Sequence, residues 1–114
     1  MIQLNFGRDV QGYPAYAPAL SDLMYSATIA SGVAQSITVP SSNENWIAVF
    51  SFQPGSDIWV SVNHTAAAPA GSTFASTNSF LLPAQLKVKA GDTISCFNNN
   101  ATGQDVGIAL YAVP

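Results

Sequence analysis

Short runs in which hydrophobic and polar residues alternate fill most of the chain, and this is the period of β-strands with one buried face. The run at 46–52 is apolar on both faces, which indicates a central strand. No segment keeps a helical period over several turns. The predicted strands are residues 24–30, 34–39, 46–52, 58–62, 79–82, 85–89, 93–97 and 106–113, with a further short strand near 72–74.

Turn signals between these runs recur about every ten residues, as in all-β sandwiches. Pro54 and Gly55 form the strongest of them, and they predict a β-hairpin over residues 46–62. The 114 residues suit one domain. We therefore expect an all-β fold with a single β-sandwich over residues 25–114, in a jelly-roll or similar Greek-key form.

Residues 1–24 follow a different pattern and predict an extended N-terminal arm. Apolar and polar side chains alternate over residues 2–6, and two prolines and two tyrosines follow within residues 12–19. Because proline resists helix formation and ladder pairing, the second segment is expected to be extended and unpaired. Its tyrosines either fold back over the sandwich or reach a neighbouring subunit. The arm residues assigned to subunit contact are Ile2, Leu4, Phe6, Tyr13 and Tyr16.

Trp59 is the residue whose position conflicts with burial. Ile58 and Val60 take the inward phase of their strand, so Trp59 and Ser61 point outward. Aromatic side chains often anchor interfaces, which favours an arm or subunit contact for Trp59. Packing in the core through a second sheet and stacking on a sugar ring are the alternatives.

The composition favours a protein that works in an assembly. Hydrophobic residues make up 48% of the chain but charged residues only 8%, against roughly 25% in ordinary soluble domains. A neutral polar surface can pack against neighbours without the cost of desolvating ions. The net charge is −3 and the only cations are Arg8, Lys87 and Lys89, which argues against nucleic-acid binding and against a polybasic membrane anchor.

The residues that could carry chemistry are few and scattered. His64 and Cys96 are the only histidine and cysteine, which are too few to form a zinc site from protein ligands alone. Cys96 is predicted to be a buried small hydrophobe and His64 a solvated turn residue. Asp57, Asp92 and Asp105 each lie beside a turn, where carboxylates cap backbone N–H groups. We expect no enzyme activity, no metal and no cofactor. No signal peptide is recognisable, which predicts synthesis in a cytoplasm.

Two segments of the sandwich resemble small structural proteins of tailed bacteriophages. These are residues 58–71, which read IWVSVNHTAAAPAG, and residues 89–95, which read KAGDTIS; a final strand ending in LYAV follows. The resemblance spans roughly residues 46–113 and is to the capsid cement, or decoration, proteins. These are small jelly rolls on the outside of the head that join neighbouring capsomers, and they have no catalytic residues to carry over.

The resemblance implies a non-enzymatic virion structural protein that bridges and stabilises capsid subunits on the head exterior. The implied partner is the major capsid protein, and a homo-oligomer, dimer or trimer, is expected on the head. The alternative is a carbohydrate-binding β-sandwich module of a phage tail or fibre. The contact residues are then the arm residues already named, together with Trp59.

Overall fold

The structure is a computed structural model that describes residues 2, 6–8, 14–18 and 20–114. Its described part contains strands and turns, and no helix. The strands are β1 (Phe6–Arg8), β2 (Pro14–Pro18), β3 (Leu23–Ile29), β4 (Ala34–Thr38), β5 (Asn45–Phe52), β6 (Ile58–Val62), β7 (Phe80–Leu81), β8 (Gln85–Lys89), β9 (Thr93–Asn98) and β10 (Gln104–Val113). No helix in the described part is long and apolar enough to cross a membrane.

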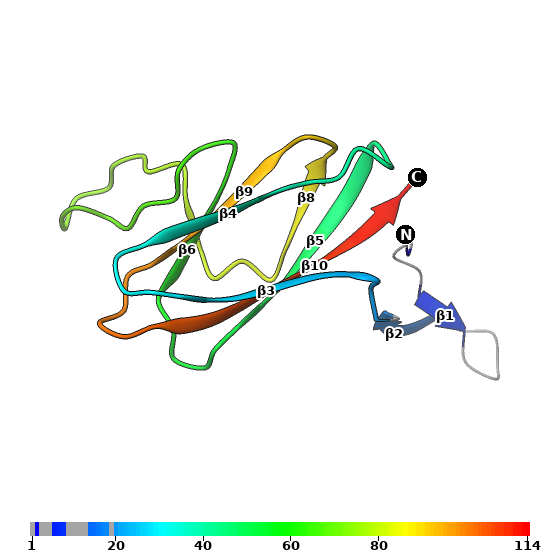
Figure 1. Cartoon of the computed structure of the whole chain (residues 1–114), viewed down its shortest axis with the longest axis horizontal. Coiled ribbons are helices and arrows are strands. Elements are labelled where there is room, and N and C mark those ends of the chain that lie inside the picture. The colour runs from blue at the N-terminus through cyan, green and yellow to red at the C-terminus, as the bar shows by residue number, and fades with distance from the viewer. Residues whose placement is uncertain (1, 3–5, 9–13, 19) are drawn as a thin grey trace.

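Strands β3 to β10 form two antiparallel four-stranded sheets that pack face to face (Figure 1). One sheet has the order β3-β10-β5-β8 and the other the order β4-β9-β6-β7. The expected all-β sandwich is therefore confirmed. Its jelly-roll form stays a prediction.

The predicted hairpin over residues 46–62 is wrong. Strand β5 pairs with β10 and β8, whereas β6 pairs with β9 and β7 in the other sheet. The turn at Pro54 and Gly55 is present, with Gly55 at a φ of 76°. It carries the chain from one sheet to the other, since β5 lies between β10 and β8 whereas β6 lies between β9 and β7.

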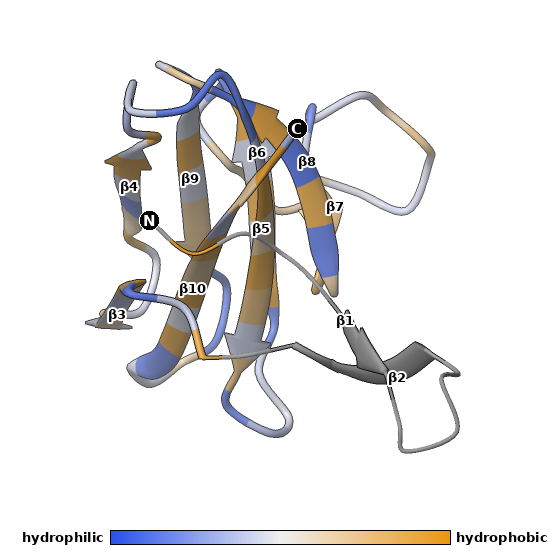
Figure 2. Cartoon of the chain, turned by 90° about the vertical axis from the view of Figure 1, so that its right-hand side faces the viewer, coloured by the Kyte–Doolittle hydropathy of each residue, from blue (hydrophilic) through white to orange (hydrophobic). Residues whose placement is uncertain are grey.

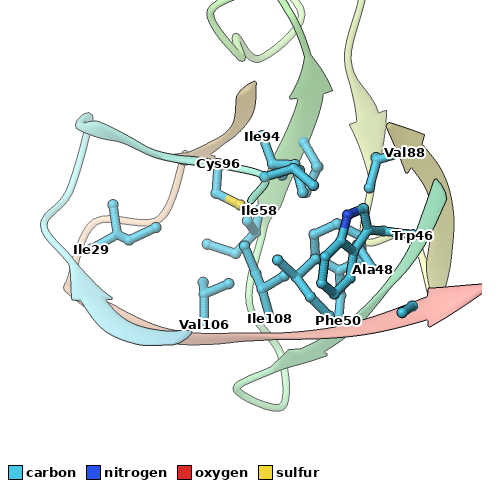
Figure 3. Packing of buried hydrophobic residues seen from close by; sticks show 14 residues of the cluster. Ile29, Trp46, Ala48, Phe50, Ile58, Val88, Ile94, Cys96, Val106 and Ile108 are labelled. Atoms are coloured by element: carbon cyan, nitrogen blue, oxygen red, sulfur yellow. The ribbon is translucent and has the colours of Figure 1, made fainter. Parts of the chain in front are cut away.

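The core lies between the two sheets and is built from the inward phase of each strand (Figure 3). Trp46 and Ala48 of β5 are fully buried there, as are Ile58 of β6 and Ile94 of β9. The inward phase predicted for Ile58 and Val60 of β6 is confirmed, because both are buried. Burial of these apolar side chains, each contributing about 1.5–3 kcal/mol, is the main source of stability.

Two further expectations are corrected by the strand assignments. Strand β2 is extended as predicted, but it pairs with β1, with Phe6 opposite Pro18 and Arg8 opposite Pro14. Prolines are tolerated here because the pair is only two strands wide, so both are edge strands. Residues 72–74 form no strand, because no neighbouring strand lies beside this exposed part of the β6–β7 loop.

Candidate contact surface

Large hydrophobic side chains gather on the loop of residues 63–79 and on β7. Phe74 in the loop is fully exposed, and Phe80 and Leu81 of β7 are 61% and 44% exposed. Leu82, directly after β7, is also exposed. We call these four residues the apolar patch. Large apolar side chains that are exposed close together in the chain favour a contact site on this part of a soluble domain.

Trp59 lies beside this patch on the outer phase of β6. Its cross-strand neighbours are Leu81 of β7 and Phe97 of β9. Trp59 is half-buried and does not belong to the cluster of core residues. The prediction that it points away from the core is therefore consistent with the structure.

The indole of Trp59 is held by a network of polar turn residues. Its Nε1 donates a hydrogen bond of 2.9 Å to Oδ1 of Asp57, and Oδ2 of Asp57 accepts one of 2.9 Å from the amide of Asn99. The side chain of Asn100 accepts from the backbone N–H of Asp57. The loop after β9 thus fixes the orientation of Trp59, which lowers the entropy that a binding contact must overcome.

That loop is itself anchored by Asn98, a fully buried polar residue. Its amide nitrogen donates to the carbonyls of Ile29 and Thr102 at 2.8 and 2.9 Å, and its Oδ1 accepts from the N–H of Asn100 at 2.8 Å. Asn98 therefore links the core to the network around Trp59.

A groove of about 770 Å³ runs between β6, β7 and the 63–79 loop. Its walls include Trp59, Phe74 and Phe80, with several hydroxyl and amide side chains. Apart from His64, its lining contains no ionisable side chain. A groove of this size is in the range of ligand-binding clefts and suits an uncharged occupant.

The loop is attached to the sheet beneath it, which corrects one expectation. Ala66 is buried, and its N–H donates to the hydroxyl of Ser95 at 3.1 Å. Ser79 closes the loop by accepting from the N–H of Ala67 at 3.1 Å. Ser61, expected to be exposed on the outer face of β6, is buried, because this face lies under the loop.

The predicted arm contacts are only partly within the described residues. Ile2 is half-buried, and its carbonyl accepts a hydrogen bond of 2.9 Å from the N–H of Ala112 in β10. Its own N–H donates to the carboxylate of Asp22 at 3.1 Å. For Phe6 and Tyr16 the structure describes the backbone strands alone.

Leu4 and Tyr13 lie outside the described residues. Whether these arm residues make subunit contacts therefore stays a prediction.

The residues considered for chemistry take structural positions. Cys96 is buried in the core, and burial raises the pKa of its thiol from 9.0 to about 11, so the thiol stays protonated near neutral pH. His64 is exposed. Asp92 caps the turn between β8 and β9, where its carboxylate accepts a hydrogen bond of 2.9 Å from the N–H of Lys89. Among the described residues, no three metal-binding side chains lie together.

Neither the apolar patch nor the anchoring role of Asn98 is among the features predicted from the sequence. The signals for the patch were present: Phe74 is the only large apolar residue of a polar loop, and three large apolar residues precede Pro83. The role of Asn98 has no comparable signal, because it lies in a run of three asparagines.

Comparison with known proteins does not assign the chain to a family. No protein-family model matches the chain, and no curated protein or solved structure matches it either.

Proposed function

We propose that this chain is a non-enzymatic virion structural protein that bridges and stabilises capsid subunits on the exterior of a tailed-phage head. The observation that carries the proposal is the apolar patch, exposed on a protein with very few charges. Such a patch is costly in a free monomer and becomes favourable when a partner covers it. The scarcity of charge lowers the desolvation cost of that contact.

The placement of the two candidate contact regions supports a bridging role. In Figure 1 the loop that carries Phe74 projects at one end of the molecule, and the β1–β2 pair lies at the other. The molecule is 51 Å long and less than 30 Å across. Two contact regions so far apart can engage two different subunits, and many such links on one shell act together through multivalency.

We further propose that the sandwich is a jelly roll, and the strand orders support this form. The first and last strands of the sandwich, β3 and β10, are neighbours in one sheet, and successive strands mostly alternate between sheets. Cys96 offers no ready nucleophile, because its buried thiol stays protonated near neutral pH.

The direct test is binding to purified heads that were assembled without this chain. We expect the double variant Phe74→Ser, Phe80→Ser to weaken binding at least about tenfold, because interface aromatics carry much of the binding energy. Met24→Ser is the matched control, since Met24 is similarly exposed, at 56%, but lies outside the patch on β3. Equal binding by the double variant and the wild type would contradict the role of the patch.

The arm is tested by deleting residues 1–19. The deletion removes the hydrogen bonds of Ile2 with Ala112 and with Asp22, so we expect a loss of stability of only about 1–2 kcal/mol. Binding to heads should be lost. If the shortened protein does not fold, the arm is part of the sandwich and this part of the proposal is wrong.

A carbohydrate-binding module of a tail or fibre is the second candidate, and the groove beside Trp59 favours it. Its aromatic side chains and its hydroxyl and amide groups are the types that bind neutral sugars. A glycan array with the wild type and Trp59→Ala separates the two candidates. Glycan binding that Trp59→Ala abolishes, with no binding to heads, would replace the first proposal by the second.

A further inference from the structure

The sandwich has four edge strands, and they differ in how they are protected against pairing with other chains. Strand β8 carries the exposed Lys87 and Lys89, and β7 is only two residues long and is soon followed by Pro83. Lysines, short strands and prolines are the usual means of blocking an edge. Strands β3 and β4 contain no charged residue and no proline.

The two unprotected edges lie on the same side of the sandwich. Figure 2 shows β3 and β4 together on one side and β7 and β8 on the other. Between β3 and β4 is an apolar cleft of about 190 Å³, with Tyr25 and Ile37 at its edge strands and Ile94 and Val106 on the central strands. This side of the core is thus open along two edge strands.

The backbone groups of β4 that point outward follow from its pairing with β9. Val33 accepts a hydrogen bond from the N–H of Asn98, and Val39 donates one to Asp92. In an antiparallel strand the bonding direction alternates, so residues 33, 35, 37 and 39 face β9. Ala34, Ser36 and Thr38 therefore direct their N–H and C=O groups away from it. Within the described residues, no strand pairs with this edge.

We propose that β4 pairs antiparallel with β4 of a second copy of this chain, about a two-fold axis at Ser36. In this register Ser36 faces its own equivalent, and Ala34 faces Thr38 of the other copy. Each outward N–H then meets an outward C=O, because an antiparallel edge is complementary to itself under two-fold symmetry. The two sheets that end in β4 become one continuous sheet.

The distribution of charge favours a second copy of this chain as the partner, and β4 over β3 as the strand that pairs. A charged residue at the two-fold axis would meet its own copy, and β4 carries no charged residue there or at any other position. The same pairing through β3 would place the charged Asp22, which directly precedes that strand, at each end of the pairing, whereas residues 30–42 around β4 contain no charged residue. The inference concerns self-association and does not depend on which partner the apolar patch binds.

The test is sedimentation of the full chain over a wide concentration range, together with that of Ser36→Lys. The substitution places two lysines opposite each other at the axis. We expect a concentration-dependent dimer for the wild type, and for Ser36→Lys a midpoint shifted to at least about tenfold higher concentration. Ser76→Lys in the 63–79 loop adds the same charge to an exposed serine elsewhere and should leave the dimer intact.

Ser26→Lys, at the centre of β3, distinguishes the two unprotected edges. A wild type that stays monomeric, or a dimer that Ser26→Lys dissociates and Ser36→Lys does not, would overturn the proposal. Hydrogen exchange of the unmodified chain provides a measurement that needs no variant. The amides of Ala34, Ser36 and Thr38 should exchange at least about tenfold more slowly at dimer-forming concentration than at high dilution. Equal exchange at both concentrations contradicts the pairing even if Ser36→Lys does not fold.

Discussion

The two tryptophans are anchored in the same way but lie on different faces of the sandwich. Trp46 in β5 is fully buried, and its Nε1 donates to the carbonyl of Asn43 at 2.8 Å. Trp59 in β6 is half-buried, and its Nε1 donates to Asp57 at 2.9 Å. Each indole is thus satisfied by a residue just before its strand. The phase of the strand, inward or outward, decides whether the large ring packs in the core or lies on the outer face of the sheet.

The largest expected effect is that of Trp46→Ala on stability. Removing a fully buried ring leaves a cavity between the sheets, so the free energy of unfolding should fall by about 3–5 kcal/mol. Urea unfolding followed by circular dichroism measures this change. Trp59→Ala should cost less than half as much, because that ring lies outside the core cluster. Equal losses would remove the distinction between the two rings.

Asn98→Ala comes next, because it breaks the link between the core and Trp59. The variant leaves the carbonyls of Ile29 and Thr102 without their donor, and the expected loss of stability is about 2–3 kcal/mol. The emission of Trp59 should also change as its supporting loop loosens. Asn99→Ala is the matched control: it removes one exposed hydrogen bond, and its loss should stay below about 1 kcal/mol. A smaller effect from Asn98→Ala than from Asn99→Ala would contradict the assigned role.

Trp59→Ala should act mainly on binding. If the apolar patch and its neighbour Trp59 contact the proposed partner, the substitution should weaken binding to heads by about 2 kcal/mol. Melting of the free protein should change little. A large loss of stability with unchanged binding would assign Trp59 to the fold rather than to the interface.

The inner and outer faces of the strands could be predicted from the sequence, but their partners could not. Alternation placed Ile58 and Val60 inward and Trp59 outward, because the period of a strand is a local property. The turn at Pro54 and Gly55 was also correct, yet it does not close a hairpin. A turn sequence fixes where the chain bends; which sheet the next strand joins depends on pairing with β9 and β10, far along the sequence.

The candidate site was predicted less completely than the fold. Trp59 stood out because its phase conflicts with its size, but Phe74 lies in a loop without periodicity, where exposure depends on how the loop is anchored to Ser95 and Ser79. Ser61 shows the same limit. Alternation correctly predicts that Ser61 lies on the outer phase of β6, but it does not predict the loop that buries this residue.

The free energy of unfolding should depend on pH in the alkaline range because of the buried thiol of Cys96. Burial raises the pKa of its thiol from 9.0 to about 11, so above pH 9 the unfolded chain loses this proton before the native chain does. The native state then binds more protons, and stability falls as pH rises, by about 1 kcal/mol at pH 10. Below pH 9 the contribution is constant. Urea unfolding at several pH values measures the slope, and Cys96→Ala should flatten it; an unchanged slope would exclude the thiol as its source.

The smallest expected effect is that of salt on binding through the patch. Screening acts on charges, and among the residues that line the groove beside Trp59 none is an aspartate, glutamate, lysine or arginine. Binding to heads should therefore change less than about threefold between low and moderate ionic strength, whereas a contact made by charged side chains would weaken much more steeply. Titration of heads at several salt concentrations measures this dependence, for the wild type and for the double variant Lys87→Gln, Lys89→Gln. If binding depends steeply on salt and the double variant removes this dependence, the contact lies at the charged β8 edge and not at the neutral surface around Trp59.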